Sequence, residues 1–253
     1  MSLVALTREV SPAIGRCELV HLARRPIDIE LARAQHRVYE AALRGEGCRV
    51  RTLPAEADLP DSVFVEDTAV VLDELAVITR PGAESRRPET AAVAAVLAEY
   101  RPLVTITAPG TMDGGDVLVI GRTAFVGATV RTNGAAIDQL RAALSPLGVK
   151  VESVPVRGCL HLKSAATLVA PDTVLCNPRW VAPATFAGLR VLEVADGEPG
   201  AANGLLVGTR VIYPSSFPKT AARLAAHGIA LLSVNVSELQ KAEGAVTCCS
   251  LLI

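Results

Sequence analysis

The amino-acid sequence predicts an α/β protein built as a closed ring of five ββαβ units. A cycle of strand, polar segment, apolar hairpin and helical stretch recurs about five times, and successive hairpins begin roughly 40 to 50 residues apart, a spacing typical of solenoids and propellers. About three strands accompany each helix, whereas a doubly wound α/β sheet, the alternative fold, has one helix per strand. We therefore expect a single domain over residues 1–253.

Strands and hairpins are the first elements of each cycle. Short strands rich in β-branched residues are expected at Cys48–Pro54, Leu103–Pro109, Val149–Pro155, Leu189–Ala195 and Ile229–Val236. Pairs of apolar runs around a polar tip, the pattern of a hairpin, occur at Val70–Ile78, Val117–Gly127, Ala166–Cys176 and Leu205–Pro214.

Helical patterning follows most hairpins. Helices are expected at Ile27–Gly45, Pro88–Tyr100, Asn133–Leu147 and Pro218–His227, and Pro183–Gly188 has room for one turn. The fifth unit lacks a strand partner, but Leu3–Arg8 and Thr247–Ile253 are both strand-like. Pairing these two ends would close the ring and remove exposed sheet edges.

Composition narrows the range of functions. The chain is 50% hydrophobic, so it can bury a substantial core. A net charge of −1 and 3% aromatic residues argue against nucleic-acid binding, which needs clustered cations or stacking rings. No apolar run approaches the roughly 18 residues of a membrane-crossing helix, and Arg8, Glu9 and Pro12 interrupt any secretory signal. The six cysteines show no CxxC or zinc-like spacing, so we expect a reduced, cytoplasmic protein.

The densest acidic segment runs from Asp61 to Asp67. If the segment is extended, Asp61 and Asp67 point to one side and Glu66 to the other. Paired carboxylates match the fork of a guanidinium, so the segment is a candidate cradle for a cation with several donors. The alternative is a solvated loop whose acids pair with local arginines.

A glycine-rich run, Gly110–Asp116, contains two further acids. Asp113 is a candidate for orienting a histidine, and Asp116 for capping the turn. Glycines allow close approach of the backbone to another group. The alternative is an ordinary turn whose aspartates bond only to nearby backbone.

One histidine and one pair of cysteines occur at the same phase of the repeat as the acids. His161 is the only histidine there, and the remaining histidines are interpreted as structural or surface residues: His21, His36 and His227. If the segment that contains Cys248 and Cys249 is a strand, only one of the two thiols faces the hub. A thiolate needs a cationic or hydrogen-bonding neighbour, which His161 would supply. The alternative for each cysteine is an inert core residue.

Two arginines follow the hairpins. Arg86 and Arg131 are candidates for binding a substrate carboxylate at the rim of the site, and the alternative is surface charge.

Taken together, these motifs resemble the dimethylarginine dimethylaminohydrolases, a branch of the guanidine-modifying pentein superfamily. The resemblance is carried by the stretches DSVFVED, ITRPGAESRR, APGTMDGGD, RTN, HLKS and GAVTCCSLLI, which begin at residue 61 and end at the C-terminus in the family's order. It implies a five-bladed α/β propeller, the pentein fold.

The resemblance also implies a role for each site residue. Cys248 would be the nucleophile, His161 the general acid/base, and Asp113 the acid that supports the histidine, although some members carry Glu at that position. Asp61, Glu66 and Asp67 would bind the guanidinium of the substrate, and Arg86 and Arg131 its carboxylate. Leu19 would belong to a lid over the substrate, and the backbone of Ala242 would contact it near the α-amino group.

The implied reaction hydrolyses asymmetric dimethylarginine or monomethylarginine to citrulline and an amine, through a thiouronium adduct on Cys248. It requires no metal and no organic cofactor, and its partner is this small-molecule substrate; the protein would be a monomer or a homodimer. One alternative is an arginine deiminase-like hydrolase of unmethylated arginine, although the chain is too short for that family's extra helical domain. Another is a ring protein that binds a partner without catalysis, which would have no use for a cysteine, a histidine and acids at one phase.

Overall fold

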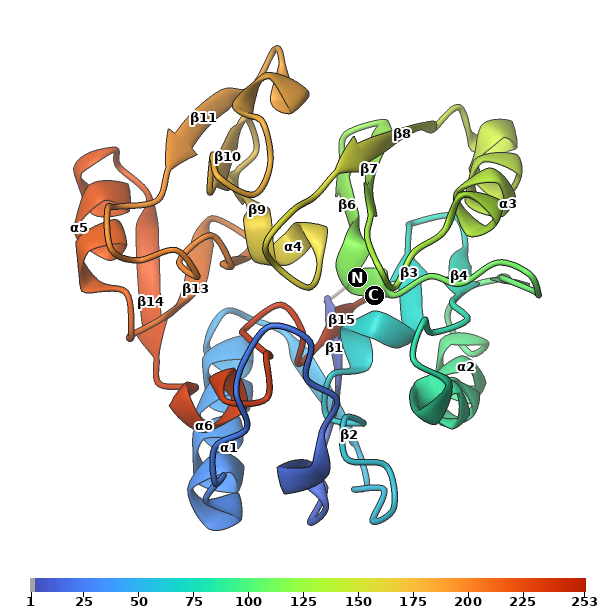
Figure 1. Cartoon of the computed structure of the whole chain (residues 1–253), viewed down its shortest axis with the longest axis horizontal. Coiled ribbons are helices and arrows are strands. Elements are labelled where there is room, and N and C mark those ends of the chain that lie inside the picture. Colours follow the sequence, from blue (N-terminus) through green and yellow to red (C-terminus); the bar gives the residue numbers. More distant parts are fainter. Residues whose placement is uncertain (1–2) are drawn as a thin grey trace.

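Figure 1 shows five small sheets arranged as blades around a central axis. The computed structural model describes residues 3–253, and in this range each sheet has three strands. In every blade the middle strand pairs antiparallel with one neighbour and parallel with the other, and in four of the five blades the antiparallel pair is a hairpin. The expected five-bladed α/β propeller is therefore confirmed.

Four blades are each continuous in sequence. Their strands are β3 (Ala69–Val71), β4 (Ala76–Ile78) and β5 (Leu103–Thr105); β6 (Val117–Ile120), β7 (Thr123–Ala128) and β8 (Lys150–Pro155); β9 (Ala166–Ala170), β10 (Thr173–Cys176) and β11 (Arg190–Glu193); β12 (Leu205–Val207), β13 (Arg210–Pro214) and β14 (Ala230–Val234). The links from second to third strand contain α2 (Thr90–Leu97), α3 (Gly134–Leu144), the 3₁₀ turn Pro183–Phe186 and α5 (Pro218–Ala226).

The fifth blade joins the two ends of the chain, as expected. β15 (Leu251–Leu252) pairs antiparallel with β1 (Val4–Arg8), which pairs parallel with β2 (Arg49–Leu53). α1 (Ile29–Gly45) connects β1 to β2. The last strand is shorter than the expected Thr247–Ile253, because residues 246–249 form a turn. The backbone N–H of Thr247 donates to the side chain of Asn203 rather than to a neighbouring strand.

Most boundaries shift by a few residues for identifiable reasons. α1 begins at Ile29 because Asp28 is its N-cap and accepts a hydrogen bond from the N–H of Leu31. The predicted helix Pro88–Tyr100 is a 3₁₀ segment, Glu84–Glu89, followed by α2. β5 ends at Thr105 because the chain turns, and the Gly110 N–H bonds to the Thr107 carbonyl. Two one-turn helices have no counterpart in the prediction: α4 (Leu162–Ala165) and α6 (Ser237–Gln240).

The longer helices α1, α2, α3 and α5 lie toward the outside of the ring, whereas the one-turn helix α4 lies near its centre (Figure 1). No helix in residues 3–253 has the length and apolar character needed to traverse a lipid bilayer. One buried cluster joins the fifth blade to the blade of β3, β4 and β5. Leu6 and Leu251 contribute from the fifth blade, and Ile78, Val93 and Leu97 contribute from the other. Ring closure therefore rests on apolar packing as well as on strand pairing.

We expect Leu6→Ala to lower the free energy of unfolding by about 2–5 kcal/mol, the range for removing a fully buried leucine side chain. Leu6 is 0% exposed in this closing cluster. Urea denaturation followed by circular dichroism measures the change. Leu103→Ala, on the exposed edge strand β5, is the matched control and should cost less than about 1 kcal/mol. Equal losses from the two substitutions would contradict a closing role for the cluster.

Candidate active site

The acidic segment is not extended. Residues 61–63 form a turn and Val65–Thr68 a 3₁₀ helix, so the expectation that Asp61 and Asp67 share one side of a strand was wrong. All three acids are nevertheless buried. They have different partners: Asp61 accepts from the Glu18 N–H at 3.1 Å, and Asp67 accepts from the Gly115 N–H at 3.0 Å.

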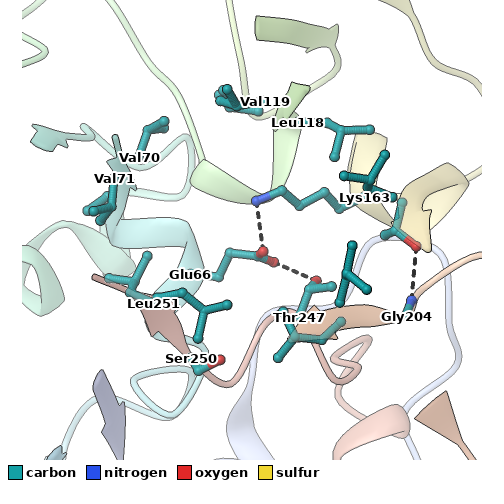
Figure 2. Close-up of a pocket in the computed structure, with 17 residues that line it drawn as sticks. Glu66, Val70, Val71, Leu118, Val119, Lys163, Gly204, Thr247, Ser250 and Leu251 are labelled. Carbon is teal, nitrogen blue, oxygen red and sulfur yellow. Dashed lines mark hydrogen bonds and ion pairs between the residues drawn. The ribbon is translucent and has the colours of Figure 1, made fainter. Parts of the chain in front are cut away.

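Glu66 closes the floor of the site. Its Oε1 lies 2.8 Å from Lys163 Nζ, and its Oε2 accepts a hydrogen bond from Thr247 Oγ1 at 2.8 Å (Figure 2). These three side chains line a cavity of about 300 Å³ together with Val70, Leu118, Leu251 and other apolar residues. Lys163 and Thr247 were missed as functional residues, because nothing along the chain links them to Glu66.

Arg86 is buried within the site rather than exposed at its rim. Its Nη1 lies 2.5 Å from Asp67 Oδ2, and its Nη2 lies 2.9 Å from Glu89 Oε2. Burial raises the pKa of Glu89 to about 7, although Arg86 opposes the shift. Sequence reasoning missed Glu89, although its spacing of three residues from Arg86 was a signal for a pair on one helical turn.

His161 and Asp113 form a close pair. His161 Nε2 lies 3.0 Å from Asp113 Oδ2, and His161 Nδ1 lies 3.8 Å from Asp67 Oδ1. Burial alone would lower the pKa of His161, but the surrounding carboxylates of Asp67, Asp113 and Asp116 outweigh it and raise that pKa to about 9. The imidazole is therefore protonated at neutral pH and is ready to donate a proton. The predicted support of His161 by Asp113 agrees with this geometry.

Asp113 is itself held from two sides. Its Oδ1 accepts from the Gly82 N–H at 2.8 Å, and its Oδ2 lies 3.4 Å from Arg131 Nη1. Arg131 is buried like Arg86, so neither arginine is the surface charge that was the alternative, and their role in binding a substrate carboxylate stays a prediction. Both are drawn inward because buried carboxylates require paired cations.

Asp116 joins neighbouring blades, a larger role than capping its own turn. Its Oδ1 accepts from the Leu162 N–H at 3.0 Å, and its Oδ2 accepts from Thr129 and Thr132 at 2.6 and 2.7 Å. Burial raises the pKa of Asp116 to about 6. These bonds fix the start of α4, directly after His161.

Gly115 allows the acid and the histidine to approach. A Cβ atom at this position would lie 2.7 Å from both Asp67 Oδ1 and His161 Nδ1. Any side chain would therefore force the two apart, which explains why the glycine-rich run precedes this part of the hub.

Cys248 lies in the turn before β15 instead of in a strand. Its Sγ accepts from the Ala245 N–H at 3.4 Å, and its carbonyl accepts from the Glu66 N–H at 3.1 Å. Burial, followed by the charges of Glu66 and Asp67, raises the pKa of this thiol well above its usual range. Cys249 is fully buried in the apolar core. Only Cys248 is therefore placed to react beside the acids.

Leu19 and Ala242 belong to or pack against the same apolar cluster as Cys248. Leu19 is half-buried and packs with Cys248 against one apolar cluster, next to the Glu18 N–H that Asp61 accepts. Ala242 is 4% exposed and belongs to the same cluster. The structure thus brings the loop that contains Leu19 to the cysteine and the acids.

One trio of side chains has the composition of a metal site. Ligand atoms of Asp67, Asp113 and His161 lie within 4.8 Å of one another. These atoms already bond to each other or to the Gly115 N–H, an arrangement that orients an imidazole.

The fold and the hub together define a pentein, a class of enzymes that modify guanidines. The family model for arginine deiminase matches residues 55–205. Dimethylarginine dimethylaminohydrolases from Streptomyces coelicolor and Pseudomonas aeruginosa are similar to this chain: the first is 45% identical over 97% of the chain and 95% of its own length, and the second 34% identical over 88% and 89%. A citrulline complex of a Pseudomonas aeruginosa enzyme mutant superposes with a TM-score of 0.95 at 31% identity and covers 100% of both chains. The chain belongs to the dimethylarginine dimethylaminohydrolase family.

We expect Glu66→Gln to accelerate alkylation of Cys248 while it slows turnover. The substitution removes one of the charges that raise the Cys248 pKa and leaves the Lys163 cation unpaired, so the thiolate becomes easier to form. The rate of iodoacetamide labelling at about pH 8, followed by mass spectrometry, should rise by at least about fivefold. Glu74→Gln, which removes an exposed ion pair with Arg122, is the control and should label at the wild-type rate. Unchanged or slower labelling of the Glu66 variant would refute the electrostatic effect.

We expect the stabilisation contributed by His161 to disappear as the pH rises. Its folded pKa of about 9 lies above its ordinary value of 6.5, so its contribution is complete below 6.5 and is lost through about 9. The difference in melting temperature between the wild type and His161→Gln should therefore be largest near pH 6 and should shrink by about pH 10. A difference that stays constant over this range would show that the carboxylates do not hold the proton.

Proposed function

We propose that this chain hydrolyses Nω-methylated arginines, asymmetric dimethylarginine and monomethylarginine, to citrulline and dimethylamine or methylamine. The observation that carries the proposal is a thiol in the same hub as buried carboxylates: the Cys248 carbonyl bonds to the Glu66 N–H, and burial, followed by the charges of Glu66 and Asp67, raises the pKa of the thiol, so the uncompensated negative charge favours a compact, multi-donor cation. A guanidinium meets that requirement because it is planar, always charged and rich in donors. The family relatives, which are named for action on dimethylarginine, support this choice.

Binding of the substrate activates the nucleophile. We propose that Asp61, Glu66 and Asp67 hold the guanidinium, whose positive charge offsets the charges that keep the Cys248 thiol protonated. The thiol proton leaves to solvent as the cation binds. The thiolate then attacks the central guanidinium carbon, and the C–S bond forms.

His161 acts twice in the proposed sequence. As an imidazolium it donates its proton to the departing dimethylamine or methylamine when the C–N bond breaks, which leaves a thiouronium adduct on Cys248. As a neutral imidazole it then accepts a proton from the water that attacks the adduct. When the C–S bond breaks, the proton of the newly attached hydroxyl passes to the departing sulfur, which releases citrulline and restores the Cys248 thiol and the His161 imidazolium. Asp113 holds the ring throughout.

The amino-acid end of the substrate would lie toward Leu19, Ala242 and the two arginines. Among residues 3–253, Arg131 pairs with one carboxylate, that of Asp113, so it is the better placed partner for the substrate carboxylate. Arg86 already donates to Asp67 and Glu89 and to two backbone carbonyls, so a substrate carboxylate would share it with these acceptors. We propose both for this role, together with a lid at Leu19 and a backbone contact at Ala242.

A second candidate substrate is unmethylated arginine, with ammonia as the leaving group. The match to the arginine deiminase family model favours it. The chemistry at Cys248 and His161 is the same for both substrates, so relative turnover distinguishes them.

We also propose a reducing, cytoplasmic environment and a single catalytic domain over residues 1–253. The six free cysteines support the first proposal. The fifth blade, which needs both ends of the chain, supports the second. Assembly as a monomer or a homodimer stays a prediction.

We expect purified protein to form citrulline from asymmetric dimethylarginine faster than from arginine, without added metal. Cys248→Ser should lower turnover by at least about 10³-fold, because the reaction loses its nucleophile. Cys249→Ser is the matched control, and it should retain most of the activity because that thiol packs in the core. Faster turnover of arginine would move the chain to deiminase activity, and no citrulline from either substrate would refute the proposed function.

A further inference from the structure

In the loop of residues 18–22, Glu18 is bonded to Asp61 and Ser85, and the three residues that follow Leu19 are bonded to the carboxylate of Glu243. Its Oε1 accepts hydrogen bonds from the backbone N–H groups of Val20, His21 and Leu22 at 3.1, 2.6 and 2.6 Å. Its Oε2 lies 3.2 Å from the Val20 nitrogen. Three successive N–H groups directed at one anion form a compact binding nest.

The middle of the loop has little else to hold it. Within residues 3–253, no other protein group is hydrogen-bonded to the backbone of Val20, His21 or Leu22. The side chains of Val20 and Leu22 are 47% and 49% exposed, so apolar burial contributes little. The position of this segment therefore depends on Glu243.

The backbone of Glu243 adopts a conformation that favours glycine. Its φ is +58°, and among the described residues it is the only non-glycine residue with positive φ. It follows α6, where the Glu243 N–H bonds to the Gln240 carbonyl and the Gly244 N–H to the Leu239 carbonyl. This is the Schellman arrangement, whose left-handed position is usually glycine. A glutamate that remains there despite the strain points to a role for its side chain.

Both the loop and Glu243 are next to residues of the proposed substrate site. Leu19 stands between the Glu18 N–H, which is held by Asp61, and the Val20 N–H, which is held by Glu243. Glu243 directly follows Ala242, on the segment that leads to Cys248. The loop is thus tied at one side to the proposed guanidinium cradle and at the other to the nucleophile's own segment.

We propose that Glu243 is a positioning residue, whose carboxylate latches loop 18–22 over the site and so sets the place of Leu19 against the substrate. This proposal rests on the proposed function for the identity of the substrate. The latch itself is a property of the free protein. It uses a side chain that touches neither the reacting atoms nor the guanidinium cradle.

The test separates the latch from backbone strain. Glu243→Gly relieves the positive φ and removes the carboxylate, whereas Glu243→Gln keeps the strain and one acceptor oxygen. Glu74→Gln, an exposed glutamate paired with Arg122, is the control. We expect Glu243→Gly to retain or raise the melting temperature while it frees the loop, a combination that a merely structural role would not produce.

Limited trypsin digestion reads the loop directly, because the Arg24–Arg25 bond follows the latched segment. Cleavage there, followed by mass spectrometry on the full-length protein, should be at least about tenfold faster in Glu243→Gly than in the wild type, the factor supplied by one charged hydrogen bond. Glu243→Gln should be intermediate, and Glu74→Gln unchanged. Equal cleavage in Glu243→Gly and the wild type would overturn the latch.

Steady-state kinetics measures the effect of the latch on substrate binding. KM for asymmetric dimethylarginine should rise about tenfold in Glu243→Gly, while kcat changes by less than about threefold because Cys248 and His161 are untouched. A loss of kcat at constant KM would overturn the positioning role. If the wild type forms no citrulline, the proposed function fails, and the trypsin comparison still decides whether Glu243 latches the loop.

Discussion

Buried negative charge at the hub is the constraint on which the rest of the site depends. Each hub carboxylate is almost completely removed from solvent: Asp61, Glu66, Asp67, Glu89, Asp113 and Asp116. Such groups are stable only when cations or several hydrogen-bond donors face them. Arg86, Arg131, Lys163 and His161 are drawn inward for this reason, and the backbone donors of glycine-rich turns supply what the cations do not.

The same charges determine the chemistry. They raise the pKa of His161, and burial together with the same charges raises the pKa of Cys248, so both groups are protonated in the free protein. In the proposed mechanism, an incoming guanidinium changes this balance because it adds positive charge beside the thiol. If the acids bind the substrate as we propose, specificity and activation follow from one electrostatic requirement: a neutral molecule of the same shape would bind poorly and would leave the thiol protonated.

Charge pairing also holds the blades together at the hub. Lys163 and Glu66, which belong to different blades, are 97 residues apart in the sequence, and Thr247 reaches Glu66 across 181 residues. Asp116 fixes the N–H of Leu162 and with it the residue before it, His161. The ring must close for these contacts to form, which is why the pairing of β1 with β15 matters for the site as well as for stability. In the same way, the Glu243 carboxylate bonds to residues 20–22, a loop segment that has few apolar contacts of its own.

The sequence alone determined the number of blades, the hairpins, the pairing of the chain ends and the residues that meet at the hub, because strand periodicity and the phase of polar residues are local patterns. The family resemblance supplied the proposed role of each site residue. Tertiary contacts decided what local patterns do not encode: the turn at Cys248, the 3₁₀ helix at Glu66, the burial of Arg86 and the partners Glu89, Lys163 and Thr247. Burial and desolvation depend on residues brought together from distant parts of the chain, so the direction of the Cys248 and His161 pKa shifts could be derived only from the folded ring.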